Sequence, residues 1–99
     1  MKPVTVINHL LLKPGKMDEF IEAQQSFAAK RPIGLIGGRM YRSIDGQSAV
    51  LVSQFESVRA QEQIFQTDAF KQHLNKLRSL VESSSPGVYE EAYSTGDFK

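Results

Sequence analysis

The stretch VTVINHLLLKPG, residues 4–15, decides how the rest of the chain is interpreted. It begins with mostly apolar and β-branched residues, which are typical of a buried strand, and it ends at the Pro14-Gly15 step. Because side chains alternate along a strand, one face carries Val4, Val6, Asn8, Leu10 and Leu12. Asn8 is therefore expected to point into packed protein or into a cavity. An unpartnered amide there costs roughly 1–3 kcal/mol, so we expect a hydrogen-bond partner or a ligand.

The hydrophobic period becomes helical after this strand. Apolar residues recur at helical spacing over residues 17–28, and Arg31-Pro32 ends the predicted helix. The glycine-rich segment 33–38 then leads into a second predicted strand that ends near Ile44. Asp45-Gly46 predicts a tight hairpin turn with positive φ angles.

The second half of the chain is expected to repeat this alternation. A third predicted strand, residues 48–55, returns antiparallel to the second, and Ser57 is a typical N-cap for a short helix. Thr67-Asp68 is another capping pair, and a longer helix follows it. The apolar stripe of that helix comprises Phe70, Leu74, Leu77, Leu80 and Val81. We expect residues 83–87 to be a linker and residues 88–93 to be the last strand.

The predicted order is β-α-β-β-α-β with the second helix divided in two, which is the split arrangement of ferredoxin-like α+β domains. It produces a four-stranded antiparallel sheet with helices on one face. The other face is also apolar, at Ile7 and Leu11 of the first strand and at Val50 and Val52 of the third. We therefore expect two copies to associate face to face as a homodimer.

Length and composition limit the classes of function. The 99 residues fit a single domain, 1–99, and a chain this small buries only somewhat over ~60% of its unfolded surface, which favours self-association. A net charge of +1 with scattered basic residues provides no patch for nucleic acid or an anionic membrane. The absence of cysteine excludes disulfides and thiolate metal sites and fits a cytoplasmic location. No segment is long enough to span a membrane, and the N-terminal run lacks a signal-peptide cleavage pattern.

Four motifs follow one another along nearly the whole chain. They are NHLLLKPG (residues 8–15), IGLIGGRMYRS (33–43), LVSQFES (51–57) and TDAFKQHLNKL (67–77). In this order and spacing the chain resembles the antibiotic biosynthesis monooxygenase (ABM) family of the dimeric α+β barrel superfamily. The resemblance implies a dimeric α+β barrel that binds small molecules between the sheet and the helices. Some members oxygenate polycyclic phenols or quinols without metal or flavin, and others bind and degrade haem.

The haem-degrading branch has an asparagine on the first strand, a tryptophan at the end of the third and an axial histidine on the last helix. Asn8 matches the first of these, at the same spacing ahead of Gly15. Phe55 replaces the tryptophan and keeps an aromatic wall without the indole donor. Leu74 occupies the expected histidine position, and His73 precedes it by one residue. The expected cofactor is therefore none, with haem as the minority alternative.

These residues define a candidate site. The resemblance implies Asn8 and His73 as catalytic residues and no metal ligand. The substrate-binding candidates are Phe55, Phe70, Leu74, Tyr41 and Arg39. An arginine or tyrosine near a phenolate would stabilise its anionic form. The side-chain direction of Arg39, Tyr41 and Gln54 is open by one register step.

The expected function is the cofactor-independent oxygenation of a small aromatic or quinol-like compound. An alternative from a different class is a dimer that binds a small hydrophobic molecule and catalyses nothing. The same residues also admit structural roles, with Asn8 bonded to backbone, His73 at the edge of the core and the phenylalanines inside it.

Overall fold

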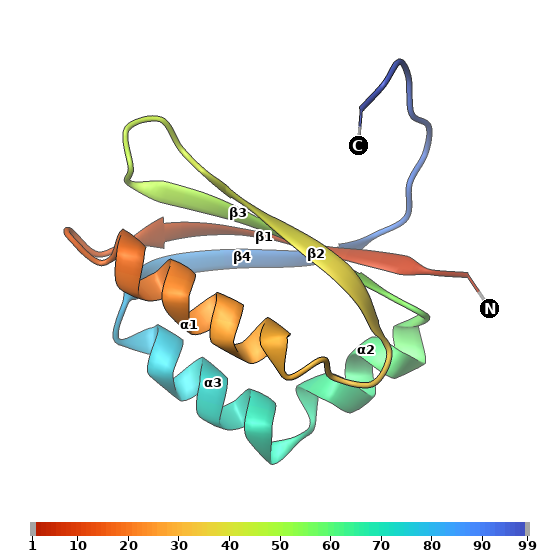
Figure 1. Cartoon of the computed structure of the whole chain (residues 1–99), viewed down its shortest axis with the longest axis horizontal. Helices are drawn as coiled ribbons and strands as arrows, with labels where there is room; N and C mark the ends of the chain where they lie inside the picture. Colours follow the sequence, from red (N-terminus) through yellow and green to blue (C-terminus); the bar gives the residue numbers. More distant parts are fainter. Residues whose placement is uncertain (1, 99) are drawn as a thin grey trace.

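The central strand of the sheet is β1 (Val4–Leu12), which pairs with β3 (Ser48–Phe55) on one side and β4 (Val81–Tyr89) on the other. β2 (Leu35–Arg42) completes the order β2-β3-β1-β4, and every pairing is antiparallel. The computed structural model describes residues 2–98, and within them it confirms the predicted ferredoxin-like α+β fold (Figure 1).

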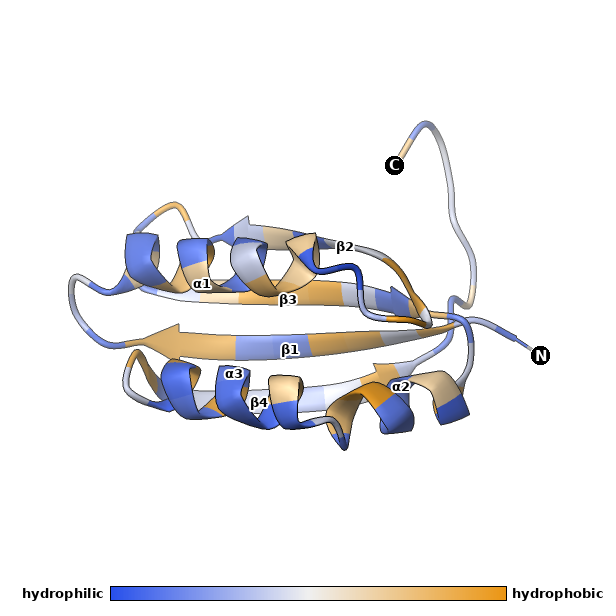
Figure 2. Ribbon diagram, turned by 60° about the horizontal axis from the view of Figure 1, so that its bottom comes forward, coloured by the Kyte–Doolittle hydropathy of each residue, from blue (hydrophilic) through white to orange (hydrophobic). Residues whose placement is uncertain are grey.

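Helices cover one face of this sheet. They are α1 (Met17–Ala29), α2 (Val58–Phe65) and α3 (Asp68–Arg78), and Figure 2 shows them on the same side of the strands. The predicted caps that divide the second helical region are confirmed. The Ser57 hydroxyl oxygen accepts the Ala60 N–H at 3.1 Å, and that of Thr67 accepts the Phe70 N–H at 3.2 Å. None of the described helices is long and apolar enough to cross a membrane.

The last strand differs from the prediction. It covers Val81–Tyr89 and contains the serine run that was expected to be a linker, whereas residues 90–98 extend away from the sheet (Figure 1). Ser83, Ser84 and Ser85 pair with Leu11, Leu10 and His9 of β1. Backbone pairing along β1 forms this edge strand without help from β-propensity, and an edge position also tolerates Pro86.

The hairpin between β2 and β3 also differs in detail, because β2 ends at Arg42 rather than near Ile44. The positive φ of the predicted turn belongs to Gly46, at 75°. Asp45 acts through its side chain, which accepts the Ser43 hydroxyl at 2.6 Å and the Gln47 N–H at 3.0 Å. This pair of bonds is an Asx-type turn, which needs no left-handed backbone at the aspartate.

The core lies between the sheet and the helices as two separate clusters. One surrounds Phe20, which is fully buried, and the other surrounds Phe55 and Ile64. On the helix face of β1, Val4 and Val6 belong to the second cluster and Leu10 and Leu12 to the first. Asn8 is half-buried between them, and Figure 2 shows the hydrophilic interruption near the middle of β1.

The opposite face of the sheet has no helix over it (Figure 2). The register places Ile7, Val50 and Val52 there, and all three are half-buried within the single chain. Leu11 and Tyr41 on this face are 40% and 44% exposed. This face is therefore an apolar surface that the described chain leaves uncovered.

The loop before β2 provides a stability test, because Gly34 has φ +96° and a Cβ built there would lie 2.8 Å from the Ala60 Cβ of α2. We expect Gly34→Ala to lower the free energy of unfolding by about 3 kcal/mol, from backbone strain plus overpacking. Gly15→Ala is the control, since Gly15 has φ +74° with nothing within 4 Å. It should cost about 1–2 kcal/mol from backbone strain alone. Urea denaturation measures both, and equal losses would contradict the close contact with α2.

Candidate functional site

A cavity of about 1170 Å³ lies between the sheet and the helices. Its sheet side includes Asn8 of β1, Leu51 and Ser53 of β3, and Met40 of β2. The helical side includes the residues Ile21, Gln24, Phe27, Phe70, His73 and Leu74. The predicted position of a ligand site between the two layers therefore coincides with a cavity large enough for a ligand of several rings.

Asn8 has one of its two polar atoms bound within the protein. Its Oδ1 accepts the backbone N–H of Ser85 in β4 at 3.1 Å. This bond identifies the oxygen, because only an acceptor can face an N–H group. No hydrogen bond in the described chain uses the Nδ2 group, and Asn8 lines the cavity. Asn8 therefore has the expected partner and also retains a donor for a ligand.

Aromatic rings line the end of the cavity near α2 and α3. Phe65 stacks on Phe70 with centroids 4.4 Å apart, and Phe55 meets Phe65 edge to face at 6.0 Å. Phe27 meets Phe70 edge to face at 5.7 Å. Phe55 is only 4% exposed and Phe70 is half-buried, and Leu74 lines the cavity beside them. These contacts form a continuous wall suited to a flat apolar ligand.

His73 connects α3 to α1. Its Nε2 lies 2.6 Å from the Gln24 Oε1, and its ring stacks on Phe27 with centroids 4.4 Å apart. An amide oxygen can only accept, so Nε2 carries the proton. Burial lowers the pKa of His73 from its ordinary value of 6.5, and the nearby Lys76 and Lys30 charges lower it further. His73 is thus held as a neutral imidazole at the boundary of the cavity.

His73 has one ring nitrogen engaged within the protein, which bears on the haem alternative. Its Nε2 is already bonded to Gln24, and the stacked Phe27 ring covers one side of the imidazole. Ligation through Nε2 would require the bond to Gln24 to be replaced. Among the residues that the structure describes, no group of three His, Cys, Asp or Glu side chains comes together as a metal site.

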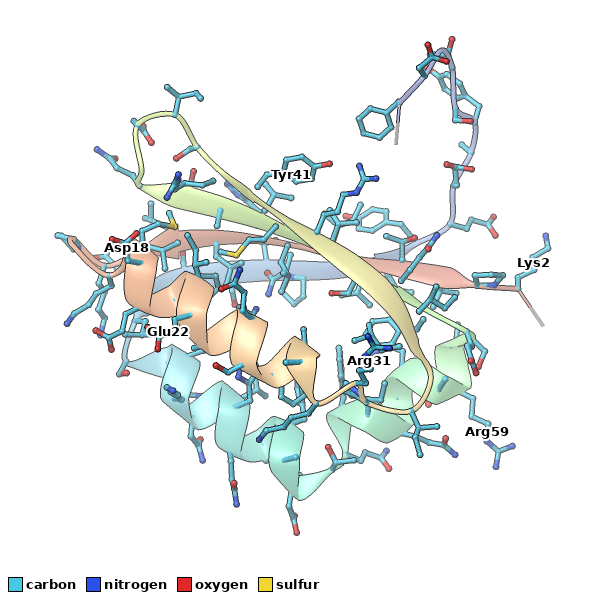
Figure 3. The ribbon with its side chains drawn as sticks, viewed as in Figure 1. Lys2, Asp18, Glu22, Arg31, Tyr41 and Arg59 are labelled. Atoms are coloured by element: carbon cyan, nitrogen blue, oxygen red, sulfur yellow. The ribbon has the colours of Figure 1, made fainter. Side chains whose placement is uncertain are left out.

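Arg39 and Tyr41 border the cavity, but their register partners lie on the other face of the sheet. Tyr41 pairs with Val50, and Figure 3 shows its ring on the side of the sheet away from the helices. Arg42 instead pairs with Ala49, which is 1% exposed in the core, so Arg42 belongs to the helix face. Alternation counted from Leu35 does not give the face of Arg42, because the pairing of β2 with β3 shifts by one residue between Leu35 and Gly37.

Sequence reasoning missed several polar residues of the cavity, among them Gln24, Arg42 and Ser53. Gln24 falls on the apolar stripe of α1, and that position was its only sequence signal. Its bond to His73 joins residues that are 49 positions apart, which no local pattern indicates.

The neutral state of His73 predicts a pH dependence of stability. Because its folded pKa is below 6.5, the unfolded chain binds the proton more readily, so stability is complete above pH 6.5 and falls as pH drops toward the folded pKa. We expect His73→Phe, which keeps a ring against Phe27, to remove this component. Urea denaturation at several pH values measures it.

The contribution of Asp45 provides the contrast in this experiment. The Ser43 hydroxyl, followed by the Gln47 N–H, lowers the pKa of Asp45 below 3.8, so the stability linked to it is lost only below that pH. Asp45→Asn should leave the loss just below pH 6.5 intact. If His73→Phe retains that loss, the assignment to His73 is wrong.

Comparison with known proteins agrees with this fold. The family model for antibiotic biosynthesis monooxygenase matches residues 3–76. The structure is similar to SnoaB, a cofactor-independent oxygenase from Streptomyces nogalater, with a TM-score of 0.85 at 23% identity over 95% of this chain and 97% of that one. A putative antibiotic biosynthesis monooxygenase from Nitrosomonas europaea gives a TM-score of 0.80 at 18% identity, covering 95% and 94% of the two chains.

A conserved protein from Methanosarcina mazei Go1 has the same fold, with a TM-score of 0.81 at 18% identity over 92% of this chain and 94% of that one. A search of curated proteins found no significant match. At these identities the solved structures establish the fold, whereas the family model spans most of the chain. The chain belongs to the antibiotic biosynthesis monooxygenase family.

Proposed function

We propose that this protein is a cofactor-independent monooxygenase that oxidises a small aromatic or quinol-like compound in the cavity between the sheet and the helices. The observation that carries the proposal is the free Nδ2 donor of Asn8 at a cavity with an aromatic wall. Membership of the family and the similarity to a cofactor-independent oxygenase support it.

The chemistry asks the protein to bind an aromatic anion and to exclude water. The deprotonated substrate transfers an electron to O₂, the two radicals join in a carbon–oxygen bond, and the resulting peroxide loses water. For a ring methylene, CH₂ plus O₂ gives C=O plus H₂O, so the substrate supplies all the electrons. No further reductant is needed.

The residues of the cavity can be assigned to these steps. Asn8 donates from Nδ2 to the substrate oxygen as negative charge develops on it. Phe55, Phe70 and Leu74 hold the ring system in place. Neutral His73 is the titratable group of the helical wall, with Nδ1 free to accept the proton that the substrate loses. Tyr41 is not suited to this role, since its ring lies on the face of the sheet away from the helices.

Asn8→Asp tests the donor directly. The aspartate keeps an oxygen for the Ser85 N–H but replaces the Nδ2 donor with an acceptor, so the fold should persist while the anionic substrate is repelled. We expect oxygen uptake with the hydroquinone or hydroxyanthrone that the wild type accepts to fall by about 10²–10³-fold. Asn8→Ala should fall similarly, with some loss of stability.

A panel of hydroquinones and hydroxyanthrones distinguishes the proposed monooxygenase from the non-catalytic alternative. Unchanged rates in Asn8→Asp would reject the role of Asn8. Saturable binding of panel compounds without any oxygen uptake would instead support a non-catalytic binding protein. A Soret band on titration with haem, lost in His73→Ala, would support the haem alternative.

We also propose that the uncovered face of the sheet forms a homodimer. Ile7, Val50 and Val52 place branched apolar side chains at its centre, and such a surface is rarely left exposed in a monomer. Burying it against a second copy would produce a closed barrel of two sheets and add support to a small core.

Light scattering at micromolar concentration tests the dimer. We expect the mass of two chains for the wild type and of one chain for Val52→Lys, because a charge at the centre of the interface would be buried without a partner. Glu62→Lys on the exposed side of α2 is the control and should remain dimeric. A wild-type monomer mass that does not change with concentration would overturn the proposal.

A further inference from the structure

The formal charges on the residues that line the cavity are positive. Arg39 and Arg42 are the formally charged residues among those that line it, and no Asp, Glu or Lys of the described chain does so. A bound anion would therefore meet attraction at the cavity and no repulsion from an acidic lining residue. The charge pattern favours a ligand that is itself negatively charged.

Arg42 is the arginine on the helix face of the sheet, at the solvent-exposed rim of the cavity. It lies in the same cross-strand row as Ala49 and Leu10. Met40, two residues earlier in β2, lies in the cross-strand row of Asn8. Arg42 forms an ion pair with Asp18 at the start of α1 (Figure 3), with Nη1 and Oδ1 4.0 Å apart. The Arg42 and Asp18 side chains are 58% and 99% exposed, so this ion pair is weak and the guanidinium at the rim of the cavity remains available.

We propose that Arg42 determines specificity by binding a carboxylate that the aromatic ligand carries at one end. This inference rests on the proposed function, since it assumes that the ring system occupies the cavity. A guanidinium binds a carboxylate through two parallel N–H donors, which gives direction as well as affinity. Neutral phenols of the same shape lack this contact.

The strand geometry sets the size of such a ligand. Asn8 and Arg42 are two strands apart across the sheet and one row apart along it. Strand spacings of about 4.8 Å and about 3.3 Å per residue put their backbone positions about 12 Å apart. With Asn8 lining the cavity and Arg42 at its rim, two or three fused rings can span the gap between the Asn8 amide and the Arg42 guanidinium.

Binding of matched fluorescent probes tests the inference without relying on turnover. The probes are anthracene-2-carboxylate and its uncharged carboxamide, titrated into the full-length protein. We expect the wild type to bind the carboxylate about tenfold or more tightly than the amide, as for a hydrogen bond to a charged group. In Arg42→Gln the two affinities should become equal. Arg39→Gln is the matched control, because it removes the same charge from the other face and should keep the preference.

Each outcome decides the matter. Equal affinities in the wild type, no binding of either probe, or loss of the preference in Arg39→Gln but not in Arg42→Gln would overturn the role of Arg42. Equal losses in both variants would show a general field rather than a binding contact and would also overturn it. Oxygen uptake by neutral quinols is a separate readout, so the proposed function can survive without the carboxylate, and the carboxylate preference can hold in a protein that oxidises nothing.

Discussion

The antiparallel register of β1 against its two neighbours is the constraint on which the rest of the structure depends. It sets Asn8 opposite Leu51 and Leu10 opposite Ala49. Because strand side chains alternate, a shift of one residue would turn the whole apolar row away from the helices. Leu10 and Ala49 are 3% and 1% exposed, and burying a leucine-sized side chain is worth about 1.5–3 kcal/mol. The apolar residues on either side therefore hold the Asn8 amide at the helix face.

The cavity exists because the core is discontinuous along this row. One cluster closes around Phe20 and the other around Phe55. Between them, on the helix face of the sheet, lie Asn8 of β1, Ser53 of β3 and Gly38 of β2, whose side chains are polar, short or absent. On the helical side the aromatic rings support one another, and each such pair is worth about 0.5–1.5 kcal/mol beyond its buried area. Contacts among these rings therefore stabilise the helical wall of the cavity without requiring it to pack against the sheet.

Local signals allowed most of the fold to be predicted, because Ser57, Thr67 and the Pro14-Gly15 step act on their immediate neighbours. The errors lie where distant pairing dominates. Residues 83–85 have no strand preference and become part of β4 only through β1. The face of each β2 residue depends on an irregularity in its pairing with β3, so Arg42 could not be separated from Arg39. Asn8 and Leu74 line the cavity, and long, regular periods in the sequence indicate their faces.

Asn8 and His73 lie on opposite walls of the cavity, and each has one polar atom bonded within the protein and one left for a ligand. The bonds are to the Ser85 N–H and to the Gln24 Oε1, and they fix the orientation of each side chain before any ligand arrives. The atom left on Asn8 is a donor, and the atom left on neutral His73 is an acceptor. Under the proposed function, the phenolic hydroxyl of the substrate, which is both an acceptor and a donor, would complement this pair in a way that a purely apolar ligand would not. Burial and the charges of Lys76 and Lys30 lower the pKa of His73 and so keep its ring neutral. A protonated His73 would have no acceptor atom.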